Sequence, residues 1–147
     1  MFVDLNGFKA VNDTYGHLVG DAVLVECASR LSSVTRVGDT LARIGGDEFV
    51  LLCENLQGDG TRSGEASLGA IAARAEAALA SPVTVGVDSI SVRASIGVAS
   101  ADTAVPDLDA LLRDADHAMY RTKQAGRPWD PPAVRAPVSP SLRPPAG

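Results

Sequence analysis

A glycine pair followed by two acidic residues, in the run from Gly45 to Phe49, constrains the fold of this chain more than any other feature. The segments on either side, Thr40 to Ile44 and Phe49 to Cys53, are apolar and β-prone. Two such runs joined by glycines are typical of a tight hairpin. We therefore expect Asp47 and Glu48 at or just past its turn. Because successive strand side chains point to opposite faces, both carboxylates face one ligand only if the turn twists the backbone.

A third carboxylate, Asp4, lies in the segment Phe2 to Leu5, which has the pattern of a buried strand near its end. Carboxylates at a strand end and at a hairpin tip supply the hard oxygen ligands that Mg²⁺ takes together with phosphate oxygens and water. Two such ions can activate a hydroxyl and stabilise a leaving pyrophosphate. Acidic hairpin turns are more often merely solvated. The turn alone leaves both readings open, and Asp4 favours the metal site.

The rest of the chain alternates between helical and β patterns. We expect helices at 8–13, 21–32, 65–80 and about 106–123, and strands at 2–5, 83–85 and 90–99 in addition to the hairpin. Asp21 is also a plausible N-cap for the helix at 21–32. This order predicts an α/β fold of the α+β sandwich type, a mixed sheet flanked by helices, with the active site at one edge of the strand ends.

Composition limits the classes of function. With 147 residues and 46% hydrophobic content, the chain can bury one core. Its net charge of −5 argues against non-specific nucleic-acid binding. Cys27 and Cys53 lack the spacing of a zinc or redox site and are expected as small core residues in a reducing compartment. The chain has no signal peptide and no apolar run that could span a bilayer, so we expect a cytoplasmic domain. Other domains could still anchor the parent protein at a membrane.

Seven of the nine prolines lie between Pro128 and Pro145. A stretch of this kind cannot form regular structure or a core. We expect one folded domain over residues 1–127 and a disordered tail or linker over 128–147.

Beyond the hairpin, a series of short motifs follows in a set order. It runs Asp4 to Lys9, Asn12-Asp13 with Gly16-His17 and Gly20-Asp21, Ala42 to Ile44 into the glycine pair, Ala94 to Val98, and Ala115-Asp116 through Tyr120 to Lys123 and Gly126-Arg127. This series resembles the GGDEF domain, the catalytic domain of diguanylate cyclases. The family's fold is similar to nucleotide-cyclase and polymerase palm domains.

The resemblance implies condensation of two GTP molecules into cyclic di-GMP with release of pyrophosphate, in a homodimer whose antiparallel domains each hold one GTP. It implies Mg²⁺ or Mn²⁺ held by Asp4, the main-chain carbonyl of Leu5 and Asp47, with Glu48 as a further acid. Asp47 is also the implied proton acceptor for the attacking 3′-hydroxyl. Lys9 is the implied stabiliser of the transition state.

The resemblance also assigns the substrate contacts. Asn12, His17 and Asp21 match positions that contact guanine or ribose, and an aspartate there can accept from the N1 and N2 donors of guanine. The backbone at Phe8 matches a phosphate site at a helix start. The remaining implied substrate contacts are Gly45, Gly46, Lys123 and Arg127. For the two basic residues the alternative is that they only offset the dipole of the last helix.

One further spacing suggests regulation. Arg36 and Asp39 form an Arg-x-x-Asp motif whose aspartate is separated from Gly45 by five residues. In the family this register marks an inhibitory site for the product, and we expect feedback inhibition by cyclic di-GMP. A solvated turn is the alternative for this motif.

Family members usually begin several tens of residues earlier with a helix, so we expect a domain that lacks its N-terminal helix. Three hypotheses follow: an active diguanylate cyclase, a non-catalytic module that binds GTP or cyclic di-GMP, and an inactive fragment of a larger signalling protein.

Overall fold

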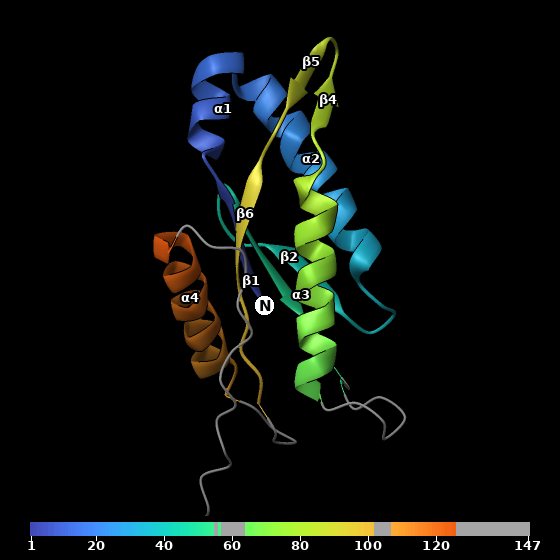
Figure 1. Cartoon of the computed structure of the whole chain (residues 1–147), viewed down its shortest axis with the longest axis vertical. Coiled ribbons are helices and arrows are strands. Elements are labelled where there is room, and N and C mark those ends of the chain that lie inside the picture. The colour runs from blue at the N-terminus through green and yellow to red at the C-terminus, as the bar shows by residue number, and fades with distance from the viewer. Residues whose placement is uncertain (55, 57–63, 102–106, 126–147) are drawn as a thin grey trace, which may run out of the picture.

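The computed structural model describes residues 1–54, 56, 64–101 and 107–125. The expected tail at 128–147, the expected contact Arg127 and the expected helix stop at Gly126 lie outside them. Figure 1 shows the elements in chain order. They are β1 (Phe2–Asn6), α1 (Phe8–Tyr15), α2 (His17–Val34), β2 (Thr40–Arg43), β3 (Glu48–Leu52), α3 (Gly64–Ala80), β4 (Val83–Val85), β5 (Asp88–Ile90), β6 (Arg93–Gly97) and α4 (Leu108–Ala125).

Four strands form one sheet in the order β2-β3-β1-β6. The expected sandwich of a sheet flanked by helices is confirmed, but each of the three pairings is antiparallel, so the expected mixed sheet is corrected. The reason is the path of the chain. After β1 and the helices α1 and α2, the chain returns to β2 at the sheet edge, and the hairpin turns β3 back into the gap between β2 and β1.

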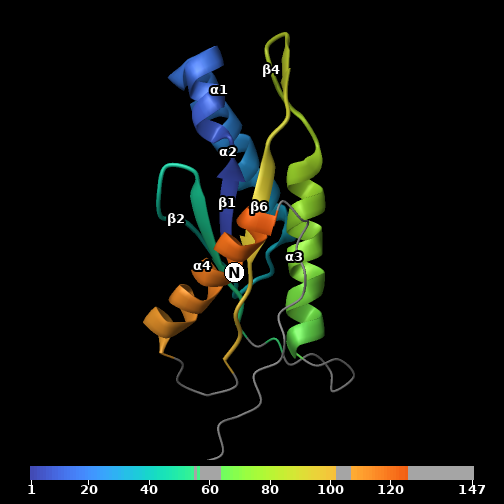
Figure 2. The ribbon, with the colours of Figure 1, turned by 60° about the vertical axis from the view of Figure 1, so that its left-hand side comes forward.

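Helices cover both faces of this sheet: α2 and α3 lie on one face, and α4 lies on the other (Figures 1 and 2). The main core lies between the sheet and the pair α2–α3, and it contains Val3 and Leu5 of β1. A smaller cluster, which consists of Phe2, Ala115 and Met119, lies under α4. Alternation along β1 therefore sends Phe2 and Asp4 toward α4, and Val3 and Leu5 toward the main core.

The second helix begins earlier than expected. α2 starts at His17 rather than Asp21, and Gly16, with φ of 84°, separates it from α1. A positive φ suits glycine and ends the helix α1. Asp21 lies inside α2, so the N-cap interpretation of Asp21 is wrong.

The expected strand at 90–99 consists of two strands. β5 pairs with β4 in a separate hairpin, whereas β6 pairs with β1 in the main sheet. The chain changes partners at Ser91 and Val92, which an apolar pattern that continues through both strands does not reveal. The β4–β5 hairpin turns at Gly86, which has φ of 62°.

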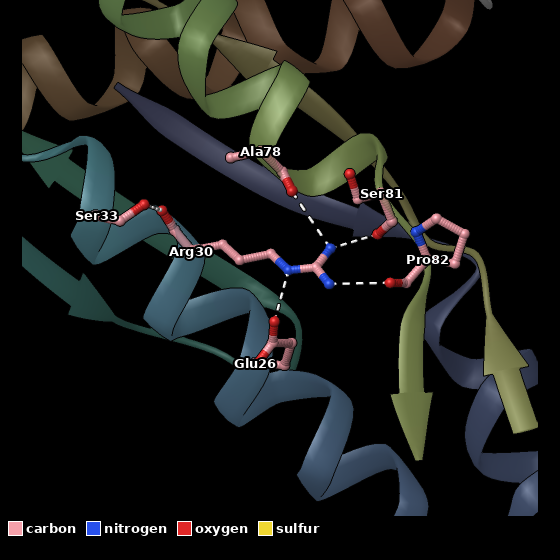
Figure 3. A network of polar contacts seen from close by, with 6 residues as sticks. All are labelled: Glu26, Arg30, Ser33, Ala78, Ser81 and Pro82. Atoms are coloured by element: carbon pink, nitrogen blue, oxygen red, sulfur yellow. Dashed lines mark hydrogen bonds and ion pairs between the residues drawn. The ribbon is translucent and has the colours of Figure 1, made fainter. Parts of the chain in front are cut away.

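Two arginines join α2 to α3. Arg74 on α3 donates to the carbonyl of Val34, the last residue of α2. In return Arg30 on α2 reaches the C-terminal end of α3 (Figure 3). Its guanidinium donates to main-chain oxygens of Ala78 (3.3 Å), Ser81 and Pro82 (2.9 Å). Because carbonyls at a helix C-terminus lack partners within the helix, each arginine completes the end of the other helix.

The helices within the described ranges include none that is long and apolar enough to cross a membrane.

Candidate functional site

Asp4 is a buried carboxylate on a central strand, with 6% of its surface exposed. It lies directly opposite Glu48 of β3 and Ser95 of β6. Residues directly opposite in antiparallel strands share a face. Glu48 and the buried Ser95 therefore flank Asp4 on the face that α4 covers.

The glycine turn places the other two acidic residues beside β1. The amide of Ile44 donates to the carbonyl of Glu48 (3.0 Å), and the amide of Leu5 donates to the carbonyl of Asp47 (3.1 Å). Glu48 is the first residue of β3, and Asp47 still belongs to the turn. The expectation that both lie at or just past the turn is confirmed. Because Asp47 precedes the strand, strand alternation does not force it away from Glu48.

Gly45 lies next to the Glu48 carboxylate. A Cβ atom at Gly45 would lie 2.3 Å from Oε2 of Glu48, closer than real Cβ contacts come. A side chain at this position would require the Glu48 carboxylate to move.

Lys123 of α4 points at this carboxylate group. Its Nζ lies 2.7 Å from Oδ1 of Asp4. The hydrogen bond to Asp4 raises the pKa of Lys123, and burial lowers it by a smaller amount. The nearby charges of Asp4, Asp47 and Glu48 raise it further, each by less than burial lowers it. Lys123 is therefore paired with Asp4, and the charges of Asp47 and Glu48 also act on it.

The position of α4 depends on residues whose role is not evident from the sequence. A Cβ atom at Gly97 would lie 2.0 Å from the Ala115 carbonyl oxygen and 2.2 Å from the Met119 amide nitrogen. The Thr122 hydroxyl lies 3.3 Å from the carbonyl oxygen of Ile96. β6 and α4 are therefore in close backbone approach next to Lys123. A glycine inside a β pattern is the one sequence signal for such an approach.

The start of α1 lies directly after β1. Gly7 has φ of 75° and turns the chain into α1, whose first amides have no partner within the helix. The Phe8 side chain is buried in the main core, so any contact of Phe8 with substrate must use its main chain. Lys9 is exposed.

The expected base contacts gather at the junction of α1 and α2. Asn12 lies against Gly20, where a Cβ atom would come within 1.9 Å of the Asn12 Oδ1. His17 and Asp21 are exposed, one turn apart on α2. Asp21 also borders a hollow of about 370 Å³ between α2 and the hairpin. Its other lining residues are Leu24, Val25, Ala28, Arg43 and Phe49.

Arg43 connects this hollow to the glycine turn. Its Nε lies 3.1 Å from the Gly45 carbonyl oxygen, and its Nη2 lies 3.0 Å from that of Gly46. The sequence motif alone assigns no role to Arg43. An arginine two residues before a glycine pair is the signal that could have suggested one.

The family model for the diguanylate cyclase GGDEF domain matches residues 1–128. The chain belongs to the GGDEF family.

Several characterised relatives contain a similar domain. The chain is 39% identical over 127 residues to the bifunctional diguanylate cyclase/cyclic di-GMP phosphodiesterase MucR of Pseudomonas aeruginosa, and 36% identical over 127 residues to the cyclic di-GMP phosphodiesterase PdeR of Escherichia coli. Each match covers 86% of this chain and 18% of the relative. The chain therefore spans less than a fifth of the length of these relatives.

Solved GGDEF structures have the same fold. An EAL/GGDEF domain protein from M. capsulatus is 38% identical and superposes with a TM-score of 0.74, over 84% of this chain and 76% of that one. The GGDEF domain of TpbB from Pseudomonas aeruginosa is 38% identical, with a TM-score of 0.72 over 84% and 74% of the two chains.

The expected inhibitory motif of this GGDEF domain lies at the opposite end of the hairpin from the glycine turn. The Arg36 amide donates to Oδ2 of Asp39 (2.8 Å), and the Asp39 amide donates to the Arg36 carbonyl (3.0 Å). Gly38, with φ of 100°, completes this turn. The Arg36 side chain is exposed. The motif therefore forms a turn, which agrees with the alternative that it is a solvated turn. The Arg36 guanidinium is exposed to solvent.

The acidic residues of the GGDEF domain suit a divalent cation by their chemistry. Among the described residues, no three His, Cys, Asp or Glu side chains gather closely enough to hold a metal ion as they stand. The buried Asp4 nevertheless already has a cation, the Lys123 ammonium, at hydrogen-bond distance. Carboxylate and carbonyl oxygens are the ligands that Mg²⁺ and Mn²⁺ take. The donor set therefore fits such an ion near Asp4 once the lysine side chain moves.

Proposed function

We propose that this domain is a diguanylate cyclase that condenses two GTP molecules into cyclic di-GMP. In each step a ribose 3′-oxygen forms a bond to an α-phosphorus, the bond to the β-phosphate oxygen breaks, and pyrophosphate leaves. The observation that carries the proposal is the place of the acidic residues next to the start of α1: Asp4 is buried opposite Glu48, and the main chain of Asp47 is hydrogen-bonded to Leu5.

Phosphates would bind at the start of α1. The main-chain amides of Phe8 and Lys9 follow Gly7 there, and the helix dipole favours an anion. The exposed Lys9 can reach the phosphorus that is attacked, where its charge offsets the charge of the transition state. Asp4, the Leu5 carbonyl and Asp47 would hold Mg²⁺ or Mn²⁺, which when bound lowers the pKa of the hydroxyl and neutralises the leaving pyrophosphate.

Asp47 would accept the proton of the attacking 3′-hydroxyl. It lies in the turn, and its main chain is hydrogen-bonded to Leu5, so the residue is held beside the C-terminal part of β1. Glu48 adds a second negative charge at the metals.

The base would lie at the junction of α1 and α2, near the hollow that Asp21 borders. A carboxylate there accepts from N1–H and N2–H of guanine, whereas adenine has no donor at those two positions. Asn12 and His17 add contacts to the base or ribose. This arrangement supports GTP as the substrate. A second copy of the domain must face the first, because two nucleotides must meet, and the use of GTP supports a cytoplasmic location.

The test is direct. The purified chain is incubated with GTP and Mg²⁺ or Mn²⁺, and cyclic di-GMP and pyrophosphate are measured by chromatography. Asp47→Asn should lower the rate by about 10² or more, since it removes both a metal ligand and the proton acceptor. Asp88→Asn, at an exposed position in the β4–β5 hairpin, is the matched control and should leave the rate unchanged. If the native chain forms no cyclic di-GMP, the proposal fails.

A second candidate is a module that binds nucleotide without turnover. It is favoured by the 36% identity to PdeR, which is named only as a cyclic di-GMP phosphodiesterase. Calorimetric titration with GTP separates the two candidates. Tight binding without product would support the module, and product formation would support the cyclase.

We further propose that cyclic di-GMP inhibits the cyclase through Arg36 and Asp39. The exposed guanidinium of Arg36 can pair with a phosphate or a guanine edge, and the Asp39 carboxylate can accept from guanine. Because the motif is remote from the glycine turn, Arg36→Ala should leave the initial rate intact and weaken inhibition by added product. Unchanged inhibition in Arg36→Ala would contradict this site.

A further inference from the structure

Lys123, an expected substrate contact, is paired with Asp4, an expected metal ligand. Nζ of Lys123 is 2.7 Å from Oδ1 of Asp4, although the two residues are 119 positions apart in the chain. The Asp4 side chain is 9% exposed, and the Lys123 side chain is 47% exposed. A charge-assisted hydrogen bond therefore links a buried anion to a cation that reaches it from solvent.

Asp4 needs a cation at this place. A carboxylate removed from water is destabilising unless a cation or hydrogen-bond donor accompanies it, and Glu48 lies directly opposite it on the same face. The charges of Asp47 and Glu48 act on the same ammonium. The lysine thus balances part of a negative charge that would otherwise destabilise this face of the sheet.

The lysine side chain can leave without moving its helix. Met119, one turn earlier, is buried against Phe2, and the Thr122 hydroxyl lies within hydrogen-bond distance of both the Ile96 carbonyl of β6 and the Ala118 carbonyl of its own helix. The four-carbon stem of Lys123 is flexible and half exposed, so rotation about its bonds can carry the ammonium away from Asp4.

We propose that Lys123 occupies the cation position at Asp4 until the metal–nucleotide complex arrives, so that a divalent ion alone binds weakly. This inference rests on the proposed metal role of Asp4. The metal ion and the ammonium compete for the same oxygen. The phosphates of the nucleotide then accept the displaced ammonium, so metal and nucleotide each favour the binding of the other.

The experiment titrates the full 147-residue chain with Mn²⁺ in the absence of nucleotide, and free Mn²⁺ is followed by electron paramagnetic resonance. Lys123→Met should bind Mn²⁺ about tenfold or more tightly than the native chain. Arg121→Met removes the same charge from an exposed position on the same helix, and it should change the affinity much less. Lys123→Arg keeps a cation within reach and should bind Mn²⁺ about as weakly as the native chain.

Two further results decide the matter. Adding Asp4→Asn to Lys123→Met should abolish the gain, because the ion then loses the oxygen that the lysine had covered. Equal affinities for Lys123→Met and Arg121→Met would overturn the inference, as would a gain that survives Asp4→Asn. These titrations need no turnover. A chain that shows the expected affinities but makes no cyclic di-GMP would refute the proposed function and leave this inference standing.

Discussion

The two faces of the sheet differ in what they bury. The face under α2 and α3 holds most of the fully buried apolar side chains, such as Val3, Leu31 and Leu51. The face under α4 holds a small apolar cluster, together with the buried Asp4 and its partner Lys123. The strand β1 contributes side chains to both faces, because successive residues point to opposite sides. The chain therefore obtains its stability on one side of a strand and places its candidate chemistry on the other side.

This division has a consequence for local stability. An element with few buried apolar contacts opens at a lower free energy than the core does. In the part of the chain that the structure describes, the buried apolar side chains of α4 are Ala115 and Met119, fewer than those of α2 or α3, so α4 should open first. Its hold on the sheet then depends on the close approach at Gly97 and on the polar contacts of Thr122 and Lys123.

The largest expected effect lies in the main core. Leu31→Ala removes a side chain with 0% exposure and should lower the free energy of unfolding by about 2–5 kcal/mol. Urea denaturation followed by circular dichroism measures this loss. Met119→Ala, on the other face, should cost less globally and should remove amide-exchange protection mainly from α4. Equal losses of stability in the two variants, with protection lost throughout, would show that the two faces form one core.

A smaller effect is expected where α4 meets β6. In Gly97→Ala the new methyl group would meet backbone atoms of Ala115 and Met119, which cannot move without the helix. Overpacking of this kind costs about 1–3 kcal/mol. The displaced helix should also carry Lys123 away from Asp4, which faster amide exchange in α4 would report.

The control for this change is Gly46→Ala. A Cβ atom at Gly46 would have no neighbour within 4 Å, and this glycine is not among those with positive φ. Its stability to urea should stay close to that of the native chain. A loss in Gly46→Ala as large as in Gly97→Ala would mean that the cost comes from the glycine backbone rather than from the contact with α4.

Much of the fold could be predicted because local patterns carry it. The hairpin on either side of Gly45 and the helix that ends at Ala80 follow from periodicity and from glycine and proline positions. The start of α2 at His17 was missed because an aspartate suits an N-cap, whereas the boundary is set by the backbone conformation of Gly16. Between β5 and β6 the chain leaves its pairing with β4 and pairs with β1. This change depends on the tertiary fold, and no local sequence pattern predicts it.

The candidate site was predictable in its members but not in its contacts. Asp47 and Glu48 could be named from their places at the turn. Asp4 could be named from its place in a buried strand, although it lies in the middle of β1 rather than near its end. The pairing of Lys123 with Asp4 depends on where α4 crosses the sheet, and helical spacing indicates only which residues share a face of α4. The roles of Arg43 and Gly97 come from backbone approaches of the same tertiary kind.

The smallest effect is expected at Cys27, which reports on the main core alone. Cys27 is fully buried on α2, and burial raises the pKa of its thiol to about 11. A raised thiol pKa disfavours the thiolate, so at pH 8 only about one molecule in a thousand carries the reactive form. In a Cys53→Ser background, Cys27 of the native chain should resist thiol reagents and react only when α2 opens.

Labelling of Cys27 therefore tests the comparison of the two faces. Leu31→Ala should accelerate the labelling, because it destabilises the core in which Cys27 lies. Gly97→Ala should leave it nearly unchanged, because α4 can loosen while α2 and α3, closed at their ends by Arg30 and Arg74, stay packed. If Gly97→Ala accelerates Cys27 labelling as much as Leu31→Ala does, the faces open together, and the site is not separable from the core that supports it.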